Sequence, residues 1–174
     1  GMSEEIISEG GLIIEPAHDR VFDFSVQYLI EGKEIRQLGI IEQIISPSGQ
    51  YRGSLSFPKF CSGMNPDIAQ FLMEKAFPCC ANNAFFTEAL RDWAEERNFE
   101  GPLGVDAYLY RDFSGALQLR TACEVNPRFT MGRVALDIRR QVAPGHGVCL
   151  EIVKAAEVTQ MQESIQLLDG RLAS

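Results

Sequence analysis

The sequence lacks any long apolar segment and is poor in basic residues. Its 174 residues are 45% hydrophobic, yet no run approaches the roughly 20 consecutive apolar residues that a membrane helix requires. Nor does the N-terminus show the charged and then apolar pattern of a secretory leader. Lys and Arg number 16 against 24 Asp and Glu, which gives a net charge of −8. Because nucleic acid and anionic lipid are bound by clustered Lys and Arg, we expect neither nucleic acid nor a membrane as a partner.

Cysteine and histidine are also scarce. The five cysteines are an odd number and include no CxxC pair, which argues against a disulfide framework and against a structural zinc site. We therefore expect reduced thiols and a cytoplasmic protein. A cysteine nucleophile would need His18 or His146 as its base, and neither lies in a recognisable motif. A cysteine-based redox enzyme or transferase stays open as a hypothesis that a low-pKa thiol would support.

The length and composition are typical of one globular domain. No internal repeat or linker divides the chain, so we expect a single domain over residues 1–174, with residues 1–10 as a disordered tail. Alternating and β-branched segments predict two antiparallel hairpins. The first pairs residues 21–30 with residues 35–45, and the second pairs residues 103–110 with residues 117–125. Shorter strands are expected at residues 12–14, 51–57 and 148–153.

Helices are expected between the two hairpins and after the second. Asn65 is placed to cap a helix, with Pro66 at its first position. An amphipathic stripe from Phe85 to Ala94 predicts another helix whose apolar side belongs to the core, and residues 134–142 predict a third. The predicted fold class is therefore α+β, an antiparallel sheet of hairpins with helices packed on one face.

The second hairpin carries the arrangement most typical of a site. Side chains alternate along a strand, so Ala122, Glu124 and Asn126 share one face of the later strand, and Cys123 lies on the other face. If the loop is centred near residues 114–115, antiparallel pairing places Asp106 opposite Glu124, with Cβ atoms about 4.5–5.5 Å apart. Two carboxylates this close repel each other unless a cation lies between them or one is protonated.

A divalent cation is the economical solution to that repulsion. The carboxylates of Asp106 and Glu124 and the carbonyl of Asn126 are hard oxygen donors of the kind that Mg²⁺ or Mn²⁺ prefers. Arg128, just past the strand, is placed to pair with a phosphate or a reacting carboxylate. The alternative is a solvated sheet face whose acidic residues have no function, and the spacing alone leaves both interpretations open.

Several of these segments resemble the C-terminal half, or catalytic lobe, of the ATP-grasp ligase superfamily. The resemblance covers residues 11–142 and is carried by three motifs, which are Leu12-Ile-Ile-Glu15-Pro16 ahead of Asp23, Gly101-Pro-Leu-Gly-Val-Asp106, and Glu124-Val-Asn126-Pro-Arg128 with Met131-Gly132. In that superfamily an acidic residue on one strand and a Glu-x-Asn on the next hold the Mg²⁺ ions that bridge the ATP phosphates. The resemblance thus implies metal ligation by Asp106, Glu124 and Asn126, and a catalytic role for Arg128 near the transferred phosphate.

The same resemblance implies a nucleotide site and an activity. The backbone of Glu15, Pro16 and Ala17, in the family's hinge, would bind adenine, and Asp23 would hold the ribose hydroxyls. The cofactors implied are ATP and Mg²⁺ or Mn²⁺. The reaction implied is that of a carboxylate–amine or carboxylate–thiol ligase, which makes an acyl phosphate and passes the acyl group to the acceptor.

The family's N-terminal lobe, which supplies lysines and a glycine-rich flap over the phosphates, has no counterpart in residues 1–10. Because phosphoryl transfer depends on positioning and charge stabilisation, we expect the chain alone to be a poor ligase or inactive. We expect a homo-oligomer, and a second polypeptide that supplies the missing lobe is a further partner to consider. The competing hypothesis is a non-catalytic ATP-grasp-derived module used for dimerisation or partner contact.

Overall fold

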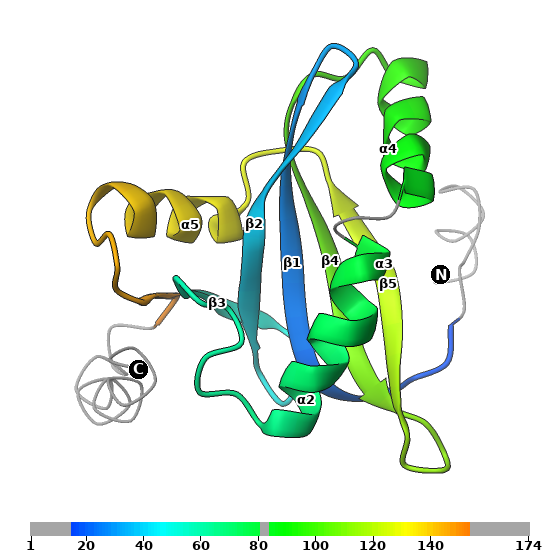
Figure 1. Cartoon of the computed structure of the whole chain (residues 1–174), viewed down its shortest axis with the longest axis vertical. Coiled ribbons are helices and arrows are strands. Elements are labelled where there is room, and N and C mark those ends of the chain that lie inside the picture. The colour runs from blue at the N-terminus through cyan, green and yellow to red at the C-terminus, as the bar shows by residue number, and fades with distance from the viewer. Residues whose placement is uncertain (1–14, 81–83, 154–174) are drawn as a thin grey trace, which may run out of the picture.

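The structure, a computed structural model, describes residues 15–80 and 84–153 (Figure 1). The expected tail at residues 1–10, the expected strand at residues 12–14 and the C-terminal segment from residue 154 lie outside the described residues.

The described residues form a six-stranded antiparallel sheet in the order β5-β4-β1-β2-β3-β6. Both predicted hairpins are present, and strand β1 joins them by pairing with β2 on one side and with β4 on the other. The strands are β1 (Asp19–Glu31), β2 (Glu34–Ile45), β3 (Tyr51–Ser56), β4 (Gly101–Arg111), β5 (Leu117–Asn126) and β6 (Val148–Glu151). The sheet together with its helices confirms the α+β class.

One face of the sheet packs against the helices that lie between the two hairpins (Figure 1). They are α2 (Pro66–Phe71), the π-helical segment η1 (Leu72–Ala76), α3 (Phe77–Cys80) and α4 (Ala84–Glu96). Asn65 caps α2 as predicted, because its side chain accepts a hydrogen bond from the Asp67 amide at 2.9 Å. The core on this face joins alternate residues of β1, among them Phe24 and Val26, to Leu72 of η1 and Leu90 of α4.

The last helix, α5 (Met131–Gln141), packs on the opposite face of the sheet. Its buried residues Ala135 and Leu136 lie over β2, where a Cβ at Gly39 would be 3.1 Å from the Leu136 side chain. The expectation that all helices share one face of the sheet is therefore wrong. The periodicity of a helix shows which side of it is apolar, but the connection to the sheet decides which sheet face that side covers.

Helix α5 also begins earlier than predicted. Thr130 caps it by accepting a hydrogen bond from the Arg133 amide at 3.0 Å, so the helix starts at Met131 and not at residue 134. This places the first turn of α5 directly beside the end of β5. None of the helices in residues 15–80 and 84–153 has the length and apolar character needed to cross a membrane.

Candidate functional site

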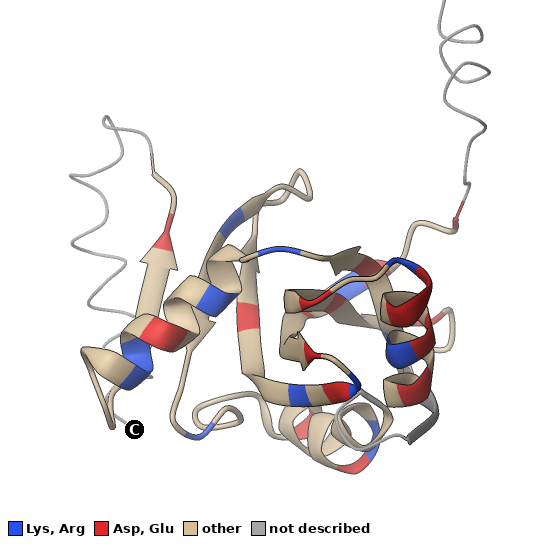
Figure 2. Cartoon of the chain, turned by 90° about the horizontal axis from the view of Figure 1, so that it is seen from above, with Lys and Arg blue, Asp and Glu red and all other residues tan. Residues whose placement is uncertain are grey.

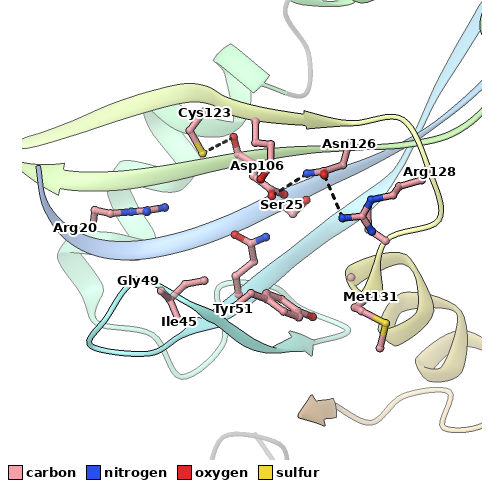
Figure 3. A pocket seen from close by; sticks show the side chains of 14 residues that line it. Arg20, Ser25, Ile45, Gly49, Tyr51, Asp106, Cys123, Asn126, Arg128 and Met131 are labelled. Atoms are coloured by element: carbon pink, nitrogen blue, oxygen red, sulfur yellow. Dashed lines mark hydrogen bonds between the residues drawn. The ribbon is translucent and has the colours of Figure 1, made fainter. Parts of the chain in front are cut away.

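A pocket of about 480 Å³ opens on the face of the sheet that carries α5 (Figure 3). Its walls come from β1, the β2–β3 hairpin, the β4–β5 hairpin and the first turn of α5. The polar residues that line it are Arg20, Ser25, Gln43, Tyr51, Asp106, Cys123, Glu124, Asn126, Arg128 and Thr130. Ten of the 14 lining residues thus have polar side chains, and they include charges of both signs.

Four residues predicted for the metal and the transferred phosphate line this one pocket. The register pairs Asp106 with Glu124 and Gly104 with Asn126, as the hairpin prediction required. Asn126 Nδ2 donates a hydrogen bond to Asp106 Oδ2 at 3.1 Å, and Arg128 Nη2 donates to Asn126 Oδ1 at 3.3 Å (Figure 3). The side chains of Asp106, Asn126 and Arg128 therefore form one connected polar group, with Glu124 beside it in the pocket lining.

Asp106 is the most buried carboxyl of this group. Burial raises its pKa above the ordinary aspartate value, and the nearby charge of Glu124 adds to the rise. Hydrogen bonds from Ser25 and Gln43 and the positive charge of Arg128 oppose it, but burial is the larger effect. A cation between Asp106 and Glu124 would relieve both the desolvation and the repulsion, because it favours the ionised form of each carboxyl.

A bulge in β5 alters which side chains reach the pocket. Asp106 pairs with Glu124, but Tyr108, two residues further on, pairs with Arg120, so β5 has two extra residues at this point. As a result Cys123 lines the pocket and Ala122 packs against the hydrophobic core. Strict alternation predicted the reverse, with Ala122 on the pocket face and Cys123 on the core face. That prediction is wrong, and the bulge is the physical reason.

The residues predicted to bind the nucleotide lie beside the pocket and do not line it. Glu15, Pro16 and Ala17 form the exposed approach to β1, and Glu15 makes an ion pair with Arg120. Asp23 makes an ion pair with Arg20. Burial raises the pKa of Asp23, while the Arg20 guanidinium lowers it. Arg20, rather than Asp23, is the member of this pair that contributes to the pocket lining.

Arg20 is a pocket residue that the sequence interpretation missed. Its guanidinium lies 4.0 Å from the centre of the Tyr108 ring, and its ion pair with Asp23 holds it from the other side. His18 supports the same cluster, with its ring stacked on Tyr110 at 3.9 Å and its Nδ1 2.9 Å from the Tyr108 hydroxyl. Alternation along β1 gave no signal for Arg20, because it has the parity of the core residues Phe22 and Phe24. The register shift between Arg20 and Phe22 brings its side chain to the opposite face of the sheet.

The charges of the two outer helices differ. Helix α4 carries Glu88, Asp92, Glu95 and Glu96 with a single arginine, whereas α5 beside the pocket carries three arginines and one aspartate (Figure 2). Much of the acidic excess on the helices therefore lies away from the pocket. Because exposed charges more than about 10 Å apart are largely screened at moderate salt, the net charge of −8 does not bar an anion from this site.

Three of the five cysteines have thiols that burial makes less acidic and therefore less nucleophilic. Burial raises the pKa of the Cys61, Cys123 and Cys149 thiols, that of Cys149 to about 11. We expect Cys149 to react with iodoacetamide at pH 8 about 100-fold more slowly than a free cysteine, because only the thiolate is nucleophilic. Mass spectrometry of alkylated peptides measures this, with the urea-unfolded chain as control. Faster modification of Cys149 or Cys123 in the folded chain than in the unfolded chain would contradict the account and revive the cysteine-enzyme hypothesis.

The donor set of the pocket suits a hard cation only in part. Within residues 15–80 and 84–153, no group of three or more His, Cys, Asp or Glu side chains is arranged to hold a metal ion. The candidate ligands are two carboxylates and one amide oxygen, from Asp106, Glu124 and Asn126. Mg²⁺ is commonly bound in proteins by one or two carboxylates, with waters and substrate phosphates as its other ligands, so the set fits that mode of binding.

No protein-family model matches the chain, and no curated protein matches it either. Function is therefore argued from the pocket itself and from the motifs that line it.

Proposed function

We propose that this chain is the ATP- and Mg²⁺-binding lobe of an ATP-grasp-type ligase. Such a ligase joins a carboxylate to an amine or a thiol through an acyl phosphate. The proposal rests on one main observation. Four residues of the motifs that resemble the family line a single pocket, namely Asp106, Glu124, Asn126 and Arg128. The antiparallel pairing of Asp106 with Glu124 supports it further, since two opposed carboxylates favour a cation between them.

In the proposed site, Asp106 and Glu124 hold the cation through carboxylate oxygens. Asn126 contributes its amide oxygen, which at present accepts a hydrogen bond from Arg128. Asn126 therefore exchanges that bond for the ion, and this frees the Arg128 guanidinium to face the substrate. When bound, Mg²⁺ supplies positive charge to the phosphate oxygens and aligns them for transfer.

The arginines supply the remaining positive charge of the pocket. Arg128 lies near the Asp106 carboxyl group. We assign it to the transferred phosphate, where a planar guanidinium can bind two oxygens at once. Arg20 is a second cation in the lining, held by Tyr108 and Asp23. We assign the exposed backbone of residues 15–17 to adenine and Asp23 to the ribose, where Asp23 exchanges its ion pair with Arg20 for the hydroxyls.

This charge inventory indicates that the chain needs help to catalyse. ATP carries about four negative charges, and its phosphoryl transfer depends on charge stabilisation. The pocket lining formed by the described residues contains two arginines and no lysine. We therefore propose that further cationic groups come from a second polypeptide or from another copy of the chain, and that the lone chain binds nucleotide without efficient turnover.

Isothermal titration with ATP tests the proposal. Binding with a millimolar or lower Kd is expected in Mg²⁺, with little binding in EDTA, because the ion bridges the protein to the phosphates. Glu124→Ala is expected to weaken binding about 10-fold or more, whereas Glu88→Ala on the exposed side of α4 is the matched control and leaves it unchanged. No binding at millimolar nucleotide, or equal binding by Glu124→Ala, would contradict the proposal and favour the non-catalytic module.

A further inference from the structure

Gln27 is a polar side chain buried beneath the pocket, where β1, β4 and α5 meet. It is 1% exposed, and its two side-chain partners are also buried, Ser25 at 2% and Thr130 at 9%. Thr130 Oγ1 donates a hydrogen bond to Gln27 Oε1 at 2.6 Å, and Gln27 Nε2 donates to Ser25 Oγ at 2.8 Å. A buried amide with both ends satisfied has a defined orientation.

Two glycines provide the space that this amide occupies. A Cβ at Gly104 would lie 2.8 Å from Thr130 Cγ2 and 3.4 Å from Gln27 Nε2. A Cβ at Gly132 would lie 3.1 Å from the same nitrogen. The backbones of β4 and α5 thus pack so close to the Gln27 amide that any side chain larger than hydrogen at Gly104 or Gly132 would crowd it. This packing restricts the rotation of the Gln27 side chain.

The hydrogen bonds of this network run in one direction, from the Arg133 amide through Thr130 and Gln27 to Ser25. The Arg133 backbone N–H can only donate, and it donates to Thr130 Oγ1 at 3.0 Å. The Thr130 hydroxyl proton is then free for Gln27 Oε1, which directs the Gln27 NH₂ group to Ser25 Oγ. Because Ser25 Oγ accepts this bond, its own proton points elsewhere.

The Ser25 proton has two acceptors within reach. The Val105 carbonyl oxygen is 3.4 Å away, longer than the usual 2.5–3.0 Å of an O–H···O hydrogen bond. Asp106, which pairs with Ser25 across β1 and β4 and lines the same pocket, offers a carboxylate as the other acceptor. A charged acceptor binds a hydroxyl more strongly than a neutral one, which favours Asp106 over the Val105 carbonyl.

We infer that Gln27 is a positioning residue, which fixes the Ser25 hydroxyl as a donor to Asp106 and so holds that carboxyl in the pocket. The network links the first turn of α5 to the proposed cation site through Thr130, Gln27 and Ser25. The effect on cation binding rests on the proposed function, whereas the orientation of Asp106 does not.

The test compares the full chain with Gln27→Met, which keeps the length of the side chain without its hydrogen bonds, and with Ser25→Ala. Mn²⁺ affinity is measured by electron paramagnetic resonance. Each variant is expected to bind Mn²⁺ about 10-fold more weakly, in line with other residues that orient a metal ligand. The double variant is expected to bind no more weakly than either single variant, because both act through one hydrogen bond. Val26→Ala, buried on the opposite sheet face, is the control for lost stability and keeps its affinity.

Unchanged affinity in Gln27→Met, or losses that add fully in the double variant, would overturn the inference. If Gln27→Met does not fold, Thr130→Val replaces it and should lose affinity, while Thr130→Ser keeps the hydroxyl and should not. If the unsubstituted chain binds no Mn²⁺, the proposed function fails, and the χ1 couplings of Asp106 measured by NMR decide the inference. Averaged couplings in Gln27→Met but not in Val26→Ala would support it, and one rotamer in both variants would overturn it.

Discussion

Asp106→Asn is expected to remove divalent-cation binding while leaving the fold as stable as before or more stable. Loss of a residue that orients a metal ligand already costs roughly 10–100-fold in affinity, so loss of a ligand itself should cost about 100-fold or more. The exchange keeps the size of the side chain and one acceptor oxygen, and it removes a carboxyl whose ionisation is opposed by burial and by Glu124.

The effect of Asp106 on stability depends on pH in a defined direction. Because the pKa of Asp106 is raised in the folded chain, the protonated form favours folding, and this contribution is complete below the ordinary aspartate pKa of about 4. It is lost as the pH rises through the raised value. At pH 7 the asparagine variant, which does not titrate, should therefore melt at the same or a higher temperature than the unsubstituted chain.

Thermal melting and Mn²⁺ titration of the same samples measure both effects. Asp67→Asn, in the exposed first turn of α2, is the matched control and should bind Mn²⁺ normally. Full Mn²⁺ affinity in Asp106→Asn would contradict the assignment of this carboxyl as a ligand. A large fall in melting temperature would contradict the conclusion that its charge is unfavourable for folding.

Phe24→Ala is expected to lower the free energy of unfolding by about 3–5 kcal/mol, the usual cost of truncating a buried phenylalanine. Phe24 is 0% exposed and lies on β1, the strand that pairs with both hairpins. Since whole domains are stable by only about 5–15 kcal/mol, this single change should remove a large share of the total. Urea denaturation followed by circular dichroism measures the loss.

Two variants serve as controls for the Phe24 prediction. Phe24→Leu keeps most of the apolar volume and should cost less than Phe24→Ala. Phe113→Ala, at a fully exposed position in the β4–β5 turn, should change stability by no more than about 0.5 kcal/mol. A loss below about 1 kcal/mol in Phe24→Ala would contradict the placement of this ring at the centre of the core.

The parts of the fold that depend on local patterns were predictable. Alternation along residues 21–30 and 117–125 and the cap at Asn65 gave the hairpins and the start of α2. These two predictions needed only contacts between residues near each other in sequence. The predicted pairing of Asp106 with Glu124 is correct for another reason: the register at the turn, where Arg111 pairs with Leu117, would place Ala122 opposite Asp106, and two extra residues in β5 bring Glu124 there instead.

The parts that depend on distant contacts were not predictable. The bulge that sends Cys123 into the pocket arises from two extra residues in β5, and alternation carries no sign of it. Ser25 and Gln27 have polar side chains and look solvated, yet they are buried. The first turn of α5 lies over Gln27, and no periodicity shows on which side of the sheet that helix packs.

The central claim is that the β4–β5 hairpin binds a divalent cation between its paired carboxylates. Paramagnetic broadening of NMR signals by Mn²⁺ tests this claim most directly. Substoichiometric Mn²⁺ is added to the ¹⁵N-labelled chain, and the loss of amide signals is mapped along the sequence. The amide signals of residues 104–106, 124–126 and 128 are expected to vanish first, before those of the acidic helix α4. Broadening that begins on α4, or spreads evenly over the acidic surface while the hairpin signals persist, would contradict it.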